Sequence, residues 1–279
     1  MLTILAAVLI GFAAWVSFGS KLYYARVQYA AYQTLRYEFA NQTGPVGPLN
    51  PNPNPNNSSE QLDPMGSPVA LLEIPALQMR DVVLEGTTGQ TLEGGPGHLR
   101  DTPLPGQQGV SVILGRRAAY GAPFAGLGSL QPGEPITVVT QEGVAHYQVL
   151  DIRRAGSPLP PSLAAGSGRL VLVTADGAPF DPTGELYVDA DLVGSPLPTV
   201  SPVLTSATLP PDENAMSTDT SAWVPLFLWG QLLLIASAAV AWLSRAWGRW
   251  QTWLVAVPVL MYLCVIVADE VTRLLPNIM

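Results

Sequence analysis

The chain has 279 residues, of which 48% are hydrophobic and only 12% are charged, and its formal net charge is −8. This composition is too apolar for an ordinary soluble enzyme of this size, so part of the chain is expected to lie in lipid. The acidic balance, without any basic stripe, excludes a nucleic-acid surface. The one cysteine, Cys264, lies in an apolar run, which excludes an intramolecular disulfide and a cysteine-rich metal site.

Residues 1–40 are interpreted as an N-terminal transmembrane anchor helix. Leu2 to Phe18 is an almost uninterrupted apolar run, about the length that crosses a hydrocarbon core of ~30 Å. No basic region precedes the run and no clear cleavage site follows it, which favours an anchor that is not removed. Residues 21–39 continue with helix-forming residues, so we expect the helix to extend into solvent.

Residues 41–68 are expected to be a linker rich in proline and asparagine. Proline removes backbone donors and favours an extended polyproline conformation. The segment is not apolar enough to offset the entropy of ordering it, so we expect a spacer between the anchor and the next domain.

Residues 69–193 are expected to form one compact all-β domain. Short β-rich runs alternate with turn sequences at the regular spacing of a closed barrel or a sandwich. The predicted strands are Val69–Ile74, Met79–Leu84, Val110–Leu114, Ile136–Thr140, His146–Arg153, Leu170–Thr174 and Leu186–Leu192. A short helix is predicted over 88–93, and a further helical turn over 124–130.

Residues 194–220 form a second expected linker, rich in proline, serine and threonine, and residues 221–279 are interpreted as a transmembrane helical hairpin. Its apolar segments, Trp223–Leu243 and Trp253–Ala268, are each long enough to span a bilayer, so three transmembrane helices are expected in all. A hairpin in addition to the anchor indicates lateral contacts with other membrane helices, or a second tether.

Basic residues predict the orientation of the chain in the membrane. Arg245 and Arg249 lie in the short connection of the hairpin, and the positive-inside rule places this turn in the cytoplasm. The N-terminus is then cytoplasmic, whereas the β domain and the C-terminus are extracytoplasmic. Lys21 and Arg26 run against this orientation. We therefore expect a multi-pass membrane protein that contacts lipid.

Seven short motifs follow one another through the β domain. They are Ile74-Pro75-Ala76-Leu77, Val83-Leu84-Glu85-Gly86-Thr87, Gly95-Pro96-Gly97-His98, Thr102-Pro103-Leu104-Pro105-Gly106-Gln107, Tyr120-Gly121-Ala122-Pro123-Phe124, Leu130-Gln131-Pro132-Gly133 and Leu172-Val173-Thr174. In this order and spacing they resemble a sortase, most of all class E and related sortases of Gram-positive bacteria. The resemblance implies a closed eight-stranded β-barrel with short helices, held outside the bacterial cytoplasmic membrane. It also implies an enzyme that joins proteins with a sorting signal to a cell-wall or pilus amine.

The catalytic residues that this resemblance implies are replaced in this sequence. Sortases use a cysteine thiolate as nucleophile, a histidine that handles protons and an arginine that steadies the oxyanion. The matching positions hold Ala175 after Leu-Val-Thr, Arg116 after Gly115, and Glu185 or a near neighbour at the last strand. A methyl group cannot form a thioester, and a cysteine inside an apolar segment does not reach an extracellular barrel. The sequence therefore predicts a barrel without the family's covalent chemistry.

Thr174 offers the alternative of a cysteine-independent nucleophile. A threonine hydroxyl needs an adjacent base, and the only histidines are His98 and His146. Arg116 stays protonated and cannot shuttle a proton. An active transpeptidase or hydrolase that works on sorting-signal peptides through unconventional residues stays open as the second reading.

Five residues are candidates for lining a peptide groove: His98, Arg117, Tyr120, Phe124 and Thr174. Each also has a structural reading, since His98 can be a hydrogen-bonded core histidine and Tyr120 and Phe124 can pack the barrel. Arg117, like most surface arginines, can simply be solvated.

No cofactor and no metal site are predicted. Some sortases bind calcium, and Asp176 and Asp181 lie in one loop, but two loop aspartates are a weak calcium signal.

The favoured function is that of a membrane-anchored, catalytically degenerate sortase-like protein, a pseudoenzyme. We expect its barrel to bind a peptide or protein partner, or to scaffold an assembly of the bacterial envelope. The expected partner is a membrane or cell-envelope protein, or a peptide that resembles a sorting signal.

Overall fold

The computed structural model describes residues 15–47, 49, 62–199, 204–246 and 248–279. The chain divides into two compact units. One consists of Tyr23–Ser217 with Pro276–Met279, and the other of the residues up to Leu22 with Thr218–Leu275. The first unit contains the β domain, and the second contains two long apolar helices.

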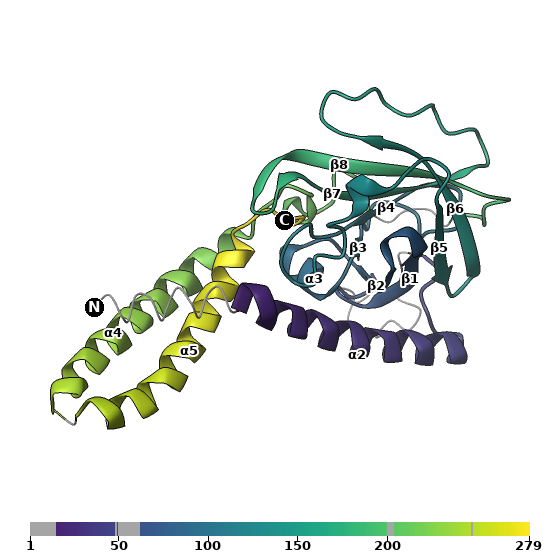
Figure 1. Ribbon diagram of the computed structural model, residues 1–279. Helices are drawn as coiled ribbons and strands as arrows, with labels where there is room; N and C mark the ends of the chain where they lie inside the picture. The colour runs from purple at the N-terminus through teal and green to yellow at the C-terminus, as the bar shows by residue number, and fades with distance from the viewer. Residues whose placement is uncertain (1–14, 48, 50–61, 200–203, 247) are drawn as a thin grey trace. The chain divides into compact units, whose positions relative to one another are not determined.

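The β domain is a closed barrel of eight strands in the order β1-β2-β3-β4-β7-β8-β6-β5 (Figure 1). The strands are β1 (Pro68–Ile74), β2 (Met79–Glu85), β3 (Gly97–His98), β4 (Gly109–Leu114), β5 (Pro135–Thr140), β6 (Gly143–Arg153), β7 (Gly168–Ala178) and β8 (Asp181–Leu192). The predicted closed eight-stranded barrel is confirmed. Seven strands match the predicted runs, and the eighth, β3, has only two residues and no readable periodicity.

Alternation of side chains along the strands builds the barrel core. In β6, Ala145, Tyr147 and Val149 are buried, whereas the residues between them face outward. In β5, Ile136 and Val138 are buried in the same way. Successive side chains of a strand point to opposite faces, so this period-two pattern puts one apolar face inside the closed sheet. The buried cluster extends over the inner faces of strands from β1 to β8.

Strand register brings the ends of β4, β7 and β8 together. β4 runs parallel to β7 with Leu114 beside Val173, and β7 runs antiparallel to β8 with Ala175 beside Glu185. Residues about 60 to 70 positions apart in the sequence therefore become neighbours at one end of three adjacent strands.

Short helices and helical turns connect elements of the barrel unit. The predicted helix over 88–93 is α3 (Gly89–Gly94), and the Thr88 hydroxyl caps it by accepting a hydrogen bond from Thr91 N at 3.3 Å. The remaining turns are η3 (Pro75–Leu77), η4 (Leu127–Ser129) and η5 (Pro211–Glu213). η4 lies within the helical turn predicted over 124–130.

Helix α2 (Ser20–Asn41) packs against the barrel from Tyr23 onward (Figure 1), which corrects the expectation that residues 21–39 extend into solvent. The Tyr24 hydroxyl donates to Asp81 at 2.8 Å, and the Gln28 amide accepts from Val82 N and donates to Val82 O. Leu35 is buried with Leu71 and other residues of β1 and β2. Tyr24, Gln28 and Leu35 are separated by four and seven positions, about one and two helical turns, so they lie on one face.

Part of the expected 194–220 linker also contacts the barrel. Leu197 pairs with Gln107, and Glu213 of η5 is fully buried beside Arg100, whose Nη2 lies 2.7 Å from Glu213 Oε1. The Thr87 hydroxyl donates to the backbone carbonyl of Glu213 at 2.6 Å. A buried ion pair that composition cannot reveal therefore holds residues near 213 on the barrel.

The second unit contains η1 (Trp15–Gly19), η6 (Thr220–Ala222), α4 (Trp223–Ala246) and α5 (Arg249–Arg273). Two helical segments in the described residues, 220–246 and 251–273, are long and apolar enough to cross a membrane. Three were expected, and the first, Leu2–Phe18, lies outside the described residues except for its last four. Helices α4 and α5 pack on each other through small and apolar side chains, among them Leu233, Ala256 and Leu260.

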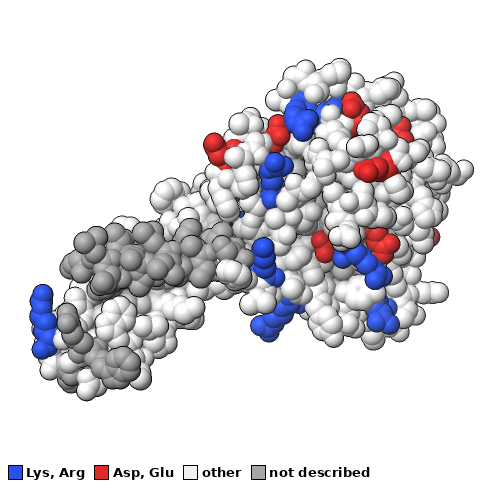
Figure 2. All heavy atoms as spheres, in the orientation of Figure 1, with Lys and Arg blue, Asp and Glu red and all other residues white. Residues whose placement is uncertain are grey.

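Charged side chains of both signs are interspersed over the barrel face drawn in Figure 2. That face shows no broad basic surface.

Candidate functional site

Arg116, Ala175 and Glu185, singled out in the sequence, lie together at the ends of β4, β7 and β8. Gly115 N donates to Val173 O at 3.0 Å, and the Thr174 hydroxyl donates to Gly115 O at 2.8 Å. Ala175 is the direct neighbour of Glu185 across the β7–β8 ladder. The topology thus assembles one site from β4 and from the β7–β8 hairpin, which follows β4 by more than 50 residues in the sequence.

Arg116 is 1% exposed and is held from several directions. Its Nη2 donates to Gly89 O at 2.9 Å and lies 3.5 Å from Glu93 Oε1, and its guanidinium lies 4.9 Å from the centre of the Tyr120 ring. A buried guanidinium is tolerated only when carboxylate, carbonyl or aromatic groups compensate it. Arg116 is therefore a fixed positive charge, and it cannot accept a proton from a substrate.

Ala175 lies in an apolar cluster with Leu92, Leu114, Val171 and Val173, which we call the Ala175 cluster. The neighbouring Thr174 is fully buried, and its hydroxyl donates to a backbone carbonyl of the barrel. None of these described positions pairs a nucleophile with a base. The centre of the site is an apolar surface.

Glu185 accepts a hydrogen bond from the Tyr187 hydroxyl, two residues along β8. Burial, followed by the bond to Glu185, raises the pKa of Tyr187 to about 12. Arg153 lies over the Tyr187 ring at 4.7 Å and forms two hydrogen bonds with the buried carboxylate of Asp189. The Glu185 carboxylate thus adjoins a neutral phenol, and the nearby Arg153 guanidinium already pairs with Asp189.

The chain itself fills the Ala175 cluster. Ile278 is fully buried against it, and Arg117 N donates to Ile278 O at 2.9 Å. Of the five groove candidates, Arg117 is the one that binds this segment, through its backbone. Sequence reasoning missed residues 276–279 because four residues after a long apolar helix carry no periodicity and no motif.

Tyr120 and Phe124 are both fully buried. Phe124 belongs to the barrel core, where its ring packs so closely on Gly115 that any Cβ there would overlap it. Tyr120 stacks edge-to-face on Tyr23 of α2, with ring centres 5.9 Å apart. Their structural reading, that they pack the barrel beside the site, is the one the geometry favours.

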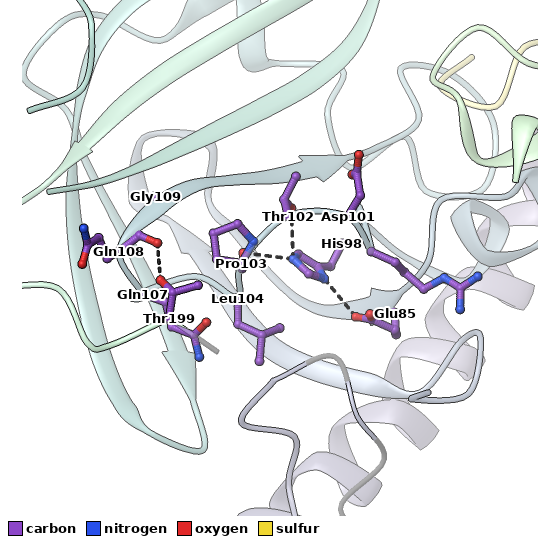
Figure 3. A pocket seen from close by; sticks show the side chains of 11 residues that line it. Glu85, His98, Asp101, Thr102, Pro103, Leu104, Gln107, Gln108, Gly109 and Thr199 are labelled. Carbon is purple, nitrogen blue, oxygen red and sulfur yellow. Dashed lines mark hydrogen bonds and ion pairs between the residues drawn. The ribbon is translucent and has the colours of Figure 1, made fainter. Parts of the chain in front are cut away.

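His98 lies apart from this group, on β3 beside a cavity of about 150 Å³ (Figure 3). Its Nδ1 lies 2.9 Å from Glu85 Oε2, and its Nε2 lies 3.1 Å from Pro103 O. Burial lowers the pKa of His98, but the charge and hydrogen bond of Glu85, with the Pro103 carbonyl, outweigh burial and raise the pKa overall. Acceptors at both ring nitrogens favour the protonated imidazole, whose hydrogen bond to Glu85 links β3 to β2.

The two calcium candidates were expected in one loop, but Asp176 lies near the end of β7 and Asp181 is the first residue of β8. Asp176 Oδ1 lies 3.5 Å from the guanidinium of Arg154. Across the described part of the chain, no three His, Cys, Asp or Glu side chains gather as a metal site would require.

Comparison with known proteins finds similarity to one family. Residues 72–193 match the family model described as the Sortase domain. The chain is similar to Sortase D of Bacillus subtilis, with 29% identity over 85 residues that cover 30% of this chain and 41% of that protein. It is also similar to Sortase SrtE1 of Streptomyces coelicolor, with 32% identity over 100 residues that cover 33% of this chain and 28% of that protein. The matched region thus spans less than half of either relative.

A solved structure, that of a Sortase D5 transpeptidase of Clostridium perfringens, is 21% identical. The match covers 61% of this chain and 99% of that one, with a TM-score of 0.46.

Proposed function

Because this chain belongs to the sortase family through residues 72–193, we propose that it is a membrane-anchored, non-catalytic member whose barrel binds a peptide or protein of the bacterial envelope. Ala175 is the observation that carries this proposal, since it holds the position that the sequence resemblance assigns to the nucleophile. A methyl group forms no thioester, and loss of a nucleophile typically lowers turnover by about 10⁴-fold or more.

The neighbouring positions support the same conclusion. Arg116, at the histidine position, is a buried cation, and Glu185, at the arginine position, carries a carboxylate where a positive charge would be needed to steady an oxyanion. The replacements remove the nucleophile, the proton carrier and the oxyanion partner together.

Thr174 does not supply a substitute. Its hydroxyl donates to Gly115 O, and the two histidines are engaged elsewhere, His98 with Glu85 and His146 near Thr137 on β5. An activated hydroxyl needs a base within hydrogen-bond reach. This geometry speaks against the second reading, an active cysteine-independent transpeptidase.

Two apolar helices support anchoring in a membrane. Arg245 in the last turn of α4 supports a cytoplasmic hairpin turn, which leaves the barrel on the extracytoplasmic side. A helical hairpin that contacts other membrane helices would place the barrel beside an envelope assembly.

An activity assay tests the loss of chemistry. The full chain is purified in lipid nanodiscs and incubated with sorting-signal peptides and an amine acceptor, and the products are followed by mass spectrometry. We expect no transpeptidation and no hydrolysis product. A product that disappears in Thr174→Val would overturn the proposal.

Site-specific photo-crosslinking tests the binding role. A photoreactive amino acid replaces Leu99, which packs at the edge of the Ala175 cluster, and in a matched control it replaces Val144, exposed on β6. We expect one recurring envelope protein captured in native membranes from position 99 and not from position 144. The same adducts from both positions, or none from position 99, would contradict a partner at this site.

A further inference from the structure

Residues 276–279 pack on the barrel although they have no helix or strand structure. Asn277, Ile278 and Met279 are all buried. Pro276–Met279 is part of the barrel unit, whereas Leu275 is part of the helical unit. The chain therefore passes from one compact unit to the other within a single peptide bond, and then stays on the barrel.

The contacts of Asn277 are polar and specific. Its Nδ2 lies 3.1 Å from Thr87 O, 2.6 Å from Asp212 O and 3.0 Å from Asn214 O, and its backbone N donates to Ser217 O at 2.9 Å. The fit is close, because a Cβ on Gly89 would come within 3.1 Å of Asn277 Oδ1. An amide donor is the chemistry that a ring of backbone carbonyls selects.

The contacts of Ile278 are apolar, with one main-chain bond. Its side chain lies against the Ala175 cluster, and its carbonyl accepts from Arg117 N. Proteins commonly bind peptides through main-chain hydrogen bonds and side-chain pockets. The segment makes both kinds of contact while folded in a turn, in which Met279 N donates to Pro276 O at 2.9 Å. The segment is thus seated as a peptide ligand would be.

Resting on the function proposed above, we propose that the Ala175 cluster, with the carbonyls of Thr87, Asp212 and Asn214, is a peptide-binding site whose resident occupant is the 276–279 segment. A partner binds there by displacing that segment, and the partner's peptide carries an asparagine followed by a branched apolar residue. The segment begins three positions after the last residue of helix α5, Arg273.

The test uses the full chain in nanodiscs and a variant that lacks residues 276–279. The probe is a fluorescent peptide of the sequence Leu-Pro-Asn-Ile-Met, capped at both ends, which matches residues 275–279. Fluorescence anisotropy should show saturable binding to the shortened chain. Binding to the full chain should be weaker by at least about tenfold, because the tethered segment competes at millimolar effective concentration. A control peptide with aspartate in place of isoleucine should lose at least about tenfold in affinity, because the apolar cluster rejects a carboxylate.

A folded shortened chain that binds no probe, or that binds both peptides alike, would overturn the proposal. If the shortened chain fails to fold, Ile278→Ser in the full chain replaces it, and this variant should bind the probe more tightly than the unchanged chain does. Equal binding would again contradict displacement. Probe binding without any adduct at position 99 would keep the peptide-binding site and its resident segment but refute a partner there. An adduct at position 99 without probe binding would keep the partner and refute displacement of the segment.

Discussion

Replacing Ile278 with alanine should release the 276–279 segment while the barrel stays folded. Ile278 is fully buried against the Ala175 cluster, yet it is not part of the main barrel core. The substitution therefore weakens a local contact rather than the closed sheet. Local opening of this kind has its own free energy, distinct from that of global unfolding.

The magnitude follows from the buried atoms. Ile278→Ala removes three carbon atoms, worth about 0.8 kcal/mol each. With the cavity left behind, the cost is about 2 to 4 kcal/mol. A free-energy change of about 1.4 kcal/mol changes an equilibrium constant tenfold. The ratio of docked to released 276–279 segment should therefore fall by roughly 30-fold to 700-fold.

Native-state hydrogen exchange measures this directly, because the Arg117 amide donates to Ile278 O. Its exchange should accelerate by at least about 30-fold, whereas amides of β5 should keep their protection. Ile235→Ala, at an exposed position of α4, is the matched control and should leave the Arg117 amide unchanged. An Arg117 amide that stays protected in Ile278→Ala would refute the reasoning. So would an equal loss of protection in β5.

Three further predictions concern the barrel, and pulse proteolysis in urea can measure each. The pKa of His98 is raised in the folded protein, so its ion pair with Glu85 stabilises the barrel fully below the unfolded pKa of about 6.5. This stabilisation should be lost as pH rises through the folded pKa, and His98→Gln should abolish that decline. Arg100→Met should lower the free energy of unfolding by about 3 to 5 kcal/mol because it leaves the buried Glu213 carboxylate without its partner. Arg80→Met breaks an exposed pair with Glu73 and should lower it by at most about 1 kcal/mol. Gly115→Ala should lower the free energy of unfolding by about 1 to 3 kcal/mol because its methyl group overlaps the Phe124 ring. Unchanged stability would contradict this packing.

The barrel could be predicted from the sequence because its determinants are local. Alternation in β5 and β6 and the turn residues between strands fix where each strand lies and which side faces inward. The positions of Arg116 and Ala175 were readable because short motifs mark the strand ends. β3 could not be found, since two residues carry no period.

Contacts between distant segments were not predictable from local pattern. The face of α2 that meets the barrel includes Gln28, whose side chain bonds to the backbone of β2, and polarity gives no sign of this. Glu213 looked like a linker residue and is buried because Arg100 compensates its charge. The 276–279 segment depends on carbonyls from three parts of the chain, which only the folded structure brings together.

The order in which the chain is synthesised gives the Ala175 cluster a period without its occupant. Residues 276–279 are synthesised roughly 80 residues after Leu192, the last residue of the barrel strands. At a synthesis rate of about 5 to 20 residues per second, this delay lasts roughly 4 to 16 s. During that interval a barrel that has already closed presents the apolar cluster uncovered. A peptide that meets the nascent protein in this interval does not compete with the 276–279 segment. The time of encounter, as well as affinity, therefore decides which occupant the site holds first.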